Sequence, residues 1–454
     1  EYQGMKVIII GGGEVGFHVA KALSEENYDI TVIDIDPFKC RRASENLDVI
    51  VVEGNGASPK ILTEAHVGEA DYVLCLTRVD EVNLIASQQA HKLGANKIIA
   101  RLRNQQYTAH DSIIRPEKFG VDVVIHPEKA ACEEIMRLVK HPYAVQVMDF
   151  EAGRLTMLGL NINGDCENII GEPLGRLCLE NSYFRFGVIA VLRGQETIVP
   201  WAEFSFKKGD IGYFIIKTED IENLLGLLSK EVTETHRVMI VGGSKIGRSL
   251  AKELPDDSIN VRLVENNRPK AGQISHSIDE SMIICGDGTD IEFLKSENIQ
   301  DVDSFISVTE NEKTNLIAGL LAKHLGAKQS IIHISTTEYI PTIQEIGAGA
   351  VISKNLSTVN SILKELHTDV TEIPVVTFDE IEVDVIEFQP ATGSLVTQRP
   401  LKELKFPEDS IVGMINHHGK IRIAHGSSIL TDDDTALVFA KPKAISKLKK
   451  LFGS

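Results

Sequence analysis

The sequence lacks the cysteine pairs that mark disulfide frameworks and structural zinc sites. Its six cysteines are scattered over 454 residues without a CxxC pair, and its 14 histidines show no metal-ligand spacing. Because both kinds of site depend on such spacing, we expect reduced thiols and no bound metal. We assign the cysteines no chemistry.

Long apolar runs are also missing. No stretch approaches the ~18–20 apolar residues that span a bilayer, and no apolar signal segment lies near the N-terminus, so we expect a cytoplasmic chain. The formal charge of −18 argues against a nucleic-acid partner and would be repelled by an anionic membrane surface. A membrane role must therefore go through a protein partner.

What the chain does contain is the composition of an ordinary globular protein. Hydrophobic residues make up 43% of it and charged residues 25%, which predicts packed domains rather than disorder. By length alone the chain has room for about three domains of roughly 150 residues each.

Two glycine-rich loops lie half a chain apart. They read Gly11-Gly12-Gly13-Glu14-Val15-Gly16 and Gly242-Gly243-Ser244-Lys245-Ile246-Gly247, with their first glycines 231 residues apart. Each loop closes a short β-branched run and opens a stretch with apolar residues at helical spacing. Later landmarks recur at an offset of 232, namely Gly54-Asn55-Gly56 with Gly286-Asp287-Gly288, Thr77 with Thr309, and Asn83 with Asn315. The chain is therefore a duplication.

Short apolar runs alternate with helical stretches after each loop. In the first half we expect strands at residues 6–10, 29–34, 48–53, 71–76 and 97–100, and the second half repeats this order. Such alternation predicts a parallel, doubly wound sheet covered by helices on both faces. Two β-rich segments, near residues 144–228 and 372–452, follow these modules and resemble each other.

We therefore predict an α/β chain of two tandem modules, each a Rossmann-like N-lobe followed by a smaller α+β C-lobe. The expected boundaries are 5–143, 144–230, 236–371 and 372–454, with a polar linker over residues 230–236. The four residues ahead of Met5 are left out of this fold prediction.

The first loop carries the features of a nucleotide site. Gly11 permits the tight turn, Gly13 lets a pyrophosphate approach the backbone, and Gly16 lets the helix pack closely on the strand. Asp34 ends the next expected strand, 21 residues after Gly13, where a carboxylate can accept both ribose hydroxyls. An acidic residue at the end of this strand would repel a 2′-phosphate and therefore favours NAD(H) over NADP(H). Asp36 is the nearest other carboxylate for binding the ribose. The alternative is a vestigial turn kept for packing.

The second loop departs from this pattern. Glu265 takes the strand-end position, again 21 residues after the middle residue of the motif, but that residue is Ser244. Its Cβ crowds the phosphate approach, although its hydroxyl can donate a hydrogen bond. A weaker affinity or a different ligand is expected here.

Further polar residues follow the strands. Asn55 and Asp287 lie where an adenine edge can be read, although a simple turn preference explains them as well. Thr77-Arg78 and Thr309-Glu310 close the fourth strands, near the expected pyrophosphate. Arg101 and Arg103 follow the fifth strand and can reach the outer charge of a triphosphate. In the second half, His333 stands at the position that matches Arg101 and is a poorer phosphate ligand. A surface ion pair is the alternative for Arg101.

With these residues in place, the sequence resembles the TrkA family of Trk-type potassium-uptake regulatory subunits, which are built from two tandem RCK (KTN) domains. The resemblance covers residues 5–452 and rests on the first loop with Asp34, the Gly54-Asn55-Gly56 turn, and the repeat that starts at Gly242. It implies a cytoplasmic ring, expected to be a homotetramer, on a membrane-embedded potassium channel or transporter. It also implies that NAD(H), ATP or ADP changes the shape of that ring. The nucleotide contacts implied by the resemblance are Gly11 to Val15, Asp34, Thr77, Arg78 and Arg101 in the first module, and Gly242 to Ile246 and Glu265 in the second.

The main functional alternative is an NAD-dependent oxidoreductase with a duplicated Rossmann domain. An enzyme needs a positioned general acid or base, and neither C-lobe segment carries a recurring His/Asp or Lys/Asp arrangement. A scaffold with inactive nucleotide folds is a third possibility. We expect a nucleotide-sensing regulator without turnover.

Overall fold

The computed structural model describes residues 5–24, 28–109, 112–180, 183–230, 233–367, 374–378, 381 and 383–453. The residues ahead of Met5, two residues of the expected linker and the expected boundary at 371/372 lie outside this part. Contacts divide the chain into two units, residues 1–131 with 354–370 and residues 132–353 with 371–454. The predicted domain boundaries stay a prediction.

The first Rossmann lobe is built on a six-stranded parallel sheet in the order β3-β2-β1-β4-β5-β6. Its strands are β1 (Lys6–Ile10), β2 (Asp29–Asp34), β3 (Ile50–Glu53), β4 (Tyr72–Cys75), β5 (Lys97–Arg101) and β6 (Val123–Ile125). Its helices are α1 (Glu14–Ser24), α2 (Pro37–Asn46), α3 (Pro59–Glu64) and α4 (Asp80–Leu93). The strand order reverses between β1 and β4, which is the switch point where doubly wound sheets bind ligands.

The second Rossmann lobe repeats this topology in the order β14-β13-β12-β15-β16-β17. Its strands are β12 (Arg237–Val241), β13 (Asn260–Glu265), β14 (Met282–Cys285), β15 (Ser304–Ser307), β16 (Gln329–His333) and β17 (Ala350–Ile352). Its helices are α8 (Lys245–Glu253), α9 (Arg268–Ser275), α10 (Ile291–Ser296), α11 (Glu312–His324) and α12 (Ile340–Ile346). The duplication is confirmed, although the short sixth strand of each sheet was not predicted.

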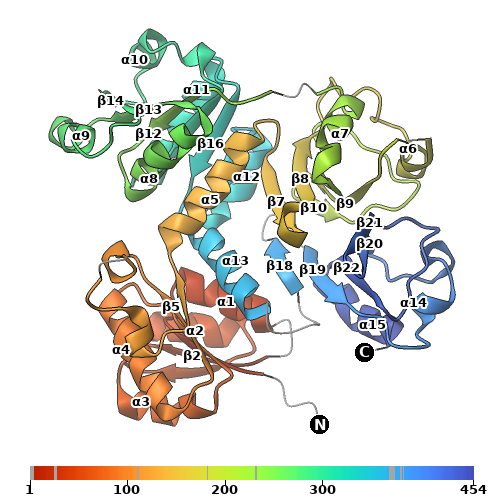
Figure 1. Cartoon of the computed structure of the whole chain (residues 1–454), viewed down its shortest axis with the longest axis horizontal. Helices are drawn as coiled ribbons and strands as arrows, with labels where there is room; N and C mark the ends of the chain where they lie inside the picture. Colours follow the sequence, from red (N-terminus) through yellow and green to blue (C-terminus); the bar gives the residue numbers. More distant parts are fainter. Residues whose placement is uncertain are drawn as a thin grey trace. The chain divides into compact units, whose positions relative to one another are not determined.

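The two halves exchange helices. Helix α13 (Lys354–His367), which follows β17 in the chain, packs beside α1 of the first lobe (Figure 1). The later turns of α5 (Pro127–Lys140) contact the second lobe, where Gln329 donates to the carbonyl of Leu138 at 3.2 Å. Each Rossmann lobe is therefore completed by a helix from the other half of the sequence, which the sequence did not predict.

The C-lobes are five-stranded antiparallel sheets in the orders β10-β9-β11-β8-β7 and β18-β19-β22-β20-β21. The first holds β7 (Gln146–Phe150), β8 (Leu155–Asn161), β9 (Phe186–Arg193), β10 (Glu196–Ile198), β11 (Ile211–Lys217), α6 (Leu174–Glu180) and α7 (Ile221–Leu227). The second holds β18 (Pro374–Phe378), β19 (Val383–Phe388), β20 (Ser410–His417), β21 (Lys420–Ile423), β22 (Asp434–Ala440), α14 (Leu395–Gln398) and α15 (Pro442–Phe452). The predicted fold class is confirmed.

The two C-lobe sheets share one hydrophobic core. Phe150 of the first meets Phe439 of the second edge to face, with ring centroids 6.3 Å apart, and both side chains are buried. Ile189 and Met414 belong to the same cluster. Apolar residues on the facing strands of both copies therefore bury each other, which joins the repeats within one chain.

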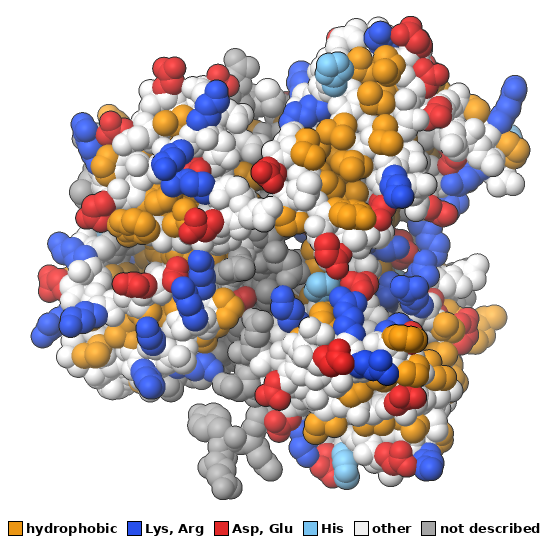
Figure 2. Space-filling model, turned by 180° about the vertical axis from the view of Figure 1, so that it is seen from behind, with side chains coloured by type: hydrophobic (Ala, Val, Ile, Leu, Met, Phe, Trp, Pro, Cys, Tyr) orange, Lys and Arg blue, Asp and Glu red, His pale blue; other side chains and the backbone are white. Residues whose placement is uncertain are grey.

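No helix in the described part of the chain is long and apolar enough to cross a membrane. On the face of the molecule in Figure 2, Lys and Arg side chains are interspersed with Asp and Glu side chains. Side chains of both charge signs therefore share this face.

Candidate functional site

The first glycine loop is held in shape by its backbone packing. Gly11 has φ +112°, and a Cβ added there would lie 2.9 Å from the amide nitrogen of Thr77. A Cβ on Gly16 would overlap the carbonyl oxygen of Gly11, whereas one on Gly13 would meet nothing within 4 Å. Gly11 and Gly16 are thus required by the turn, and Gly13 leaves its surroundings open for a ligand.

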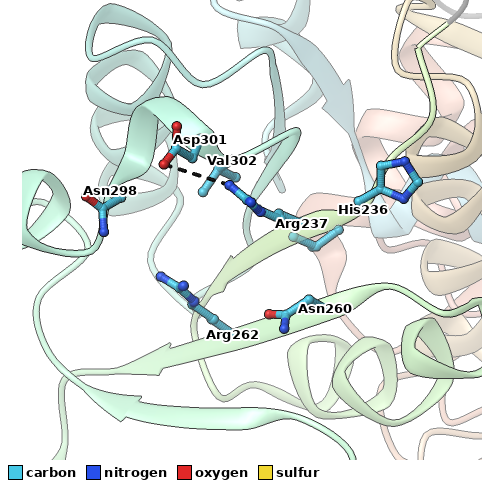
Figure 3. Close-up of a pocket in the computed structure, with 8 residues that line it drawn as sticks. His236, Arg237, Asn260, Arg262, Asn298, Asp301 and Val302 are labelled. Atoms are coloured by element: carbon cyan, nitrogen blue, oxygen red, sulfur yellow. Dashed lines mark ion pairs between the residues drawn. The ribbon is translucent and has the colours of Figure 1, made fainter.

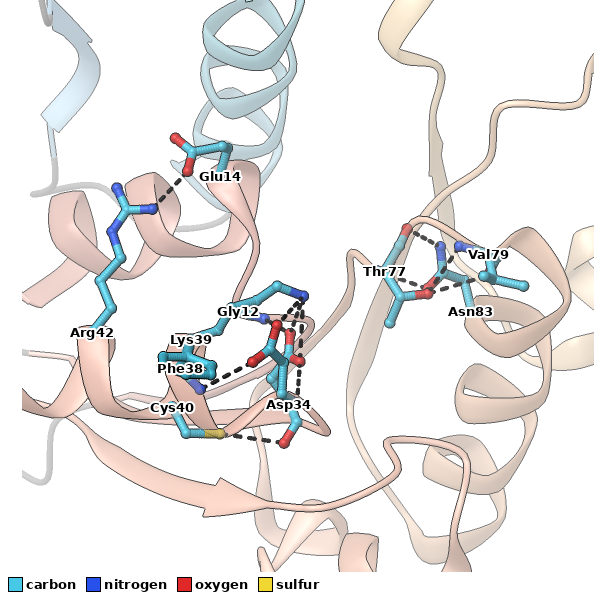
Figure 4. Close-up of polar contacts among 11 residues, drawn as sticks. Gly12, Glu14, Asp34, Phe38, Lys39, Cys40, Arg42, Thr77, Val79 and Asn83 are labelled. Carbon is cyan, nitrogen blue, oxygen red and sulfur yellow. Dashed lines mark hydrogen bonds and ion pairs between the residues drawn. The ribbon is translucent and has the colours of Figure 1, made fainter. Parts of the chain in front are cut away.

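Asp34 ties the end of β2 to this loop. Its carboxylate is 8% exposed and accepts the amide protons of Gly12 at 2.7 Å and Asp36 at 2.8 Å, as Figure 4 shows for Gly12. The Lys39 ammonium lies 3.5 Å away. Because a carboxylate offers about four acceptor sites, Asp34 keeps capacity for ribose hydroxyls. The competitor, Asp36, instead caps α2 by accepting from the amide of Phe38 at 3.0 Å.

Asn83 joins the ends of β4 and β5. Its side chain is fully buried, its Oδ1 accepts from the Thr77 amide at 2.9 Å and hydroxyl at 2.6 Å, and its Nδ2 donates to the Arg101 carbonyl at 2.7 Å. Figure 4 shows the Thr77 side of this network. The sequence pattern identified Asn83 only as a landmark of the repeat. Its recurrence as Asn315 was the signal that it builds the site.

The other predicted residues of the first site take different roles. Glu14 pairs with Arg42 of α2 at 2.6 Å (Figure 4), and Val15 is buried in the core. Asn55 accepts from the amide of Ala57 at 2.9 Å, which is the turn bond that its residue type favours. Arg78 is exposed beside Thr77.

Arg101 is buried at the end of β5 and makes no ion pair with a described residue, so the surface-ion-pair alternative is wrong. Its side chain is 7% exposed, and its Nε has no hydrogen-bond partner. Burial and the neighbouring Arg103 lower the pKa of the Arg101 guanidinium from its ordinary value. A buried cation of this kind fits an anionic ligand.

The second loop repeats the backbone of the first. Gly242 has φ +113°, and a Cβ there would lie 2.7 Å from the Thr309 amide nitrogen. Ser244, however, caps α8, because its hydroxyl oxygen accepts from the amide of Gly247 at 3.2 Å. That side chain therefore competes with a phosphate for the helix amides. Of its neighbours, Lys245 is exposed and Ile246 is buried.

Glu265 is held more tightly than Asp34. It is 6% exposed, accepts the amides of Gly243 at 3.1 Å and Asn267 at 3.0 Å, and pairs with Lys270 at 2.8 Å. Burial raises the pKa of Glu265, but the bonds from Lys270 and the two amides outweigh it, so the pKa lies below its ordinary value. The Oε2 of Glu265 already accepts from the Gly243 amide and pairs with Lys270. A ribose hydroxyl would therefore have to displace Lys270 to bond this oxygen.

The edge beyond the second loop has the same frame and different side chains. Asn315 accepts from the Thr309 hydroxyl at 2.6 Å and donates to the His333 carbonyl at 2.9 Å. Asp287 accepts from the amide of Thr289 at 2.8 Å in a turn. Glu310 stands where the first lobe has Arg78, so the second edge lacks the cations of the first.

A pocket of about 420 Å³ lies at the opposite edge of the second sheet. Figure 3 shows its lining residues, with Arg237 directed toward Asp301, 3.8 Å away. Arg237 begins β12 while the glycine loop follows the end of that strand, so this pocket belongs to neither nucleotide site. Among the residues that the structure describes, no group of three metal-ligating side chains gathers.

Family comparison agrees with this geometry. The TrkA-N domain family matches residues 7–127 and 238–354, and the TrkA-C domain family matches residues 385–453. The Trk system potassium uptake protein TrkA homolog 1 of Methanosarcina mazei is 31% identical over 456 residues, covering 99% of this chain and 100% of that protein. The Trk system potassium uptake protein TrkA of Halomonas elongata is 30% identical over 452 residues, covering 99% of this chain and 98% of that protein.

Solved structures show the same fold. The GsuK channel bound to NAD superposes with a TM-score of 0.57 at 16% identity, covering 100% of this chain and 80% of that one. The crystal structure of the GsuK RCK domain gives the same TM-score and identity and covers 96% of that chain. The tandem Rossmann and C-lobe arrangement is therefore that of a pair of RCK domains.

Proposed function

The chain belongs to the TrkA family of Trk potassium-uptake proteins, and we propose on that premise that it is a nucleotide-sensing regulatory subunit of potassium uptake. Nucleotide binds in the Rossmann lobes, and its differential affinity for two shapes of the assembly is felt by a membrane partner. The observation that carries this proposal is the pair of glycine loops, each with a buried carboxylate at the end of the neighbouring strand.

The first lobe is the stronger nucleotide site in this proposal. The open space at Gly13 admits a pyrophosphate, Asp34 accepts ribose hydroxyls, and Thr77, Arg78 and Arg101 extend along the carboxyl edge. The NAD-bound state of the GsuK channel supports NAD(H) as a ligand of this fold, and the basic edge supports ATP or ADP. The second lobe, with Ser244 and Glu265, binds more weakly.

The partner is an integral-membrane potassium channel or transporter subunit of the Trk type. The names of the relatives support this partner, and the RCK fold supports self-association into a ring, which we propose to be a homotetramer. The chain would then be cytoplasmic and peripheral on the inner face of the membrane, attached through its partner.

The contacts around the loop favour binding over turnover. Asp34 accepts two backbone amides and Asn83 bonds the backbones of Thr77 and Arg101, so the polar side chains nearest the first loop hold its shape. An oxidoreductase needs a positioned acid or base within hydrogen-bond reach of its substrate. A duplicated Rossmann oxidoreductase is therefore the less favoured function.

Three measurements test this proposal. Isothermal titration of the full chain with NADH, ATP and ADP is expected to show binding, and the absence of affinity for all three would overturn it. Co-purification with a Trk-type membrane subunit, followed by potassium flux with and without nucleotide, is expected to show nucleotide-dependent transport. Steady NADH oxidation with a panel of small carbonyl compounds would favour the oxidoreductase instead.

A further inference from the structure

A row of lysines lies along the outer side of α15 in the second C-lobe. Lys443, Lys447 and Lys450 are four and three residues apart, which places them on one side of the helix, and all three are exposed. On the opposite side, Leu448 and Phe452 are fully buried in the core of the lobe. The apolar side therefore holds the helix in place, and the lysines face the solvent.

Two of these lysines also line a groove of about 470 Å³ between α15 and the residues ahead of β20. Lys447 and Lys450 line it from the helix, and Lys405 lines it from the segment before the strand. None of the three makes an ion pair with a residue that the structure describes, and among the described lining residues only Glu408 is acidic. The groove is therefore locally positive, although the chain as a whole carries a charge of −18.

The same groove presents apolar side chains. Leu395, in the short helix α14 beside α15 (Figure 1), is 56% exposed, and Phe406 and Leu451 are partly buried. Lysines around accessible apolar groups are suited to the headgroup region of an anionic bilayer, because the apolar groups enter the interface while the ammonium groups stay at the phosphates.

The first C-lobe provides an internal comparison. Asp210 and Asp434 occupy matching positions, because each accepts at 2.8 Å the amide of the residue three positions before it. At this offset of 434 − 210 = 224, the three lysines of α15 correspond to Glu219, Asn223 and Gly226 at α7. Helix α7 nevertheless packs its apolar side into its own lobe. The lysines are therefore not needed to seat the helix, which points to a partner outside the lobe.

We propose that Lys405, Lys447 and Lys450 bind the phosphate groups of an anionic lipid bilayer, with Leu395 and Leu451 entering its interfacial region. A lysine ammonium is a flexible point charge without the fixed fork of arginine, so a row of lysines suits many mobile headgroups better than one oriented carboxylate. The net charge of the chain does not prevent this contact, because physiological salt screens charges beyond ~8 Å. This inference goes beyond the proposed function, in which a protein partner attaches the chain to the membrane.

Sedimentation with lipid vesicles tests the inference on the full chain without a membrane partner. Vesicles that contain phosphatidylglycerol are expected to bind the chain at least ~tenfold more tightly than vesicles of phosphatidylcholine alone. Raising the salt concentration from about 0.05 M to about 0.5 M is expected to release the chain, because the Debye length falls.

The decisive variant carries Lys405→Gln, Lys447→Gln and Lys450→Gln together. Its affinity for the anionic vesicles is expected to fall at least ~tenfold, because each lysine near such a surface contributes a severalfold gain in affinity. The matched control makes the same charge change at three exposed lysines in the last turns of α1, α4 and α8: Lys21→Gln, Lys92→Gln and Lys252→Gln. The control is expected to keep its vesicle binding, and circular dichroism checks that both variants are folded.

A further variant keeps the test decisive if the triple variant does not fold. Glu408→Gln removes the carboxylate of the groove and is expected to strengthen binding to anionic vesicles severalfold. Absence of binding by the unaltered chain, or equal losses in the triple variant and its control, would overturn the inference. If the unaltered chain instead binds polyglutamate but not vesicles, and the triple variant loses that binding, the groove belongs to an acidic protein segment and the lipid inference is wrong. The proposed function stands in each case, because nucleotide titration measures it separately.

Discussion

The two Rossmann lobes share a backbone frame and differ in the side chains that line it. Gly11 and Gly242 have nearly the same positive φ, and Asn83 and Asn315 make matching bonds to the neighbouring strand ends. Yet Gly13 leaves space where Ser244 caps its helix. The two lobes therefore share a turn geometry that packing requires, while the side chains at their carboxyl edges differ.

The largest expected effect tests the buried asparagines, Asn83 and Asn315, that join neighbouring strand ends in the two lobes. Asn83→Ala and Asn315→Ala each leave a buried amide and carbonyl groups unpaired, so each is expected to cost about 3 kcal/mol of unfolding free energy. Denaturant unfolding of the full chain, with hydrogen exchange to locate the effect, measures this loss. A large loss of stability in one lobe with none in the other would show that the two asparagines do not have the same structural role.

The next effect tests the ribose carboxylate. Asp34→Ala removes charge-assisted bonds to a ribose, and NADH binding is expected to weaken by ~1.5–3 kcal/mol, measured by titration. Asp36→Ala is the control, because that residue caps α2 and its loss affects stability rather than affinity. Unchanged affinity in Asp34→Ala would favour the scaffold with inactive nucleotide folds.

A reciprocal exchange of the middle residues sharpens the difference between the sites. Ser244→Gly frees the amide of Gly247 and is expected to raise second-lobe affinity by about 1 kcal/mol, whereas Gly13→Ser is expected to weaken the first lobe by a similar amount. Titration with NADH reports both changes. If both substitutions weaken binding, the helix cap made by Ser244 does not account for the difference in affinity between the two sites.

The smallest effect concerns acid stability. The pKa of Glu265 is below its ordinary value of 4.5, so its contribution to folding is present above that value and is lost as pH falls through the folded-state pKa. Lys270→Gln is expected to raise this pKa and to reduce stability near neutral pH by less than ~1 kcal/mol. Thermal unfolding across acid pH measures it, with Lys295→Gln, an exposed lysine of the same lobe, as the control. Identical acid profiles would show that Lys270 contributes nothing to Glu265.

The sequence predicted most of the fold because its signals are local. Glycines that permit a strand-to-helix turn, alternating apolar strands and helices, and landmarks repeated at one spacing all act over a few residues. The short β6 and β17 were missed because three residues give too little periodicity to read. All of the nucleotide contacts, those of the first loop, Asp34, Thr77, Arg78 and Arg101 as well as those of the second loop and Glu265, stay predictions.

By itself the sequence determined that the chain is a duplicated pair of Rossmann-like and smaller α+β lobes, with Asp34 and Glu265 beside their loops. Only the tertiary structure decided that α13 and α5 are exchanged between the halves, that the C-lobes share a core, and that Lys354 of α13 pairs with Glu128 of α5. The reason is physical: local pattern fixes which elements form, but burial of apolar faces and pairing of charges depend on residues that are far apart in the chain, such as Glu128 and Lys354.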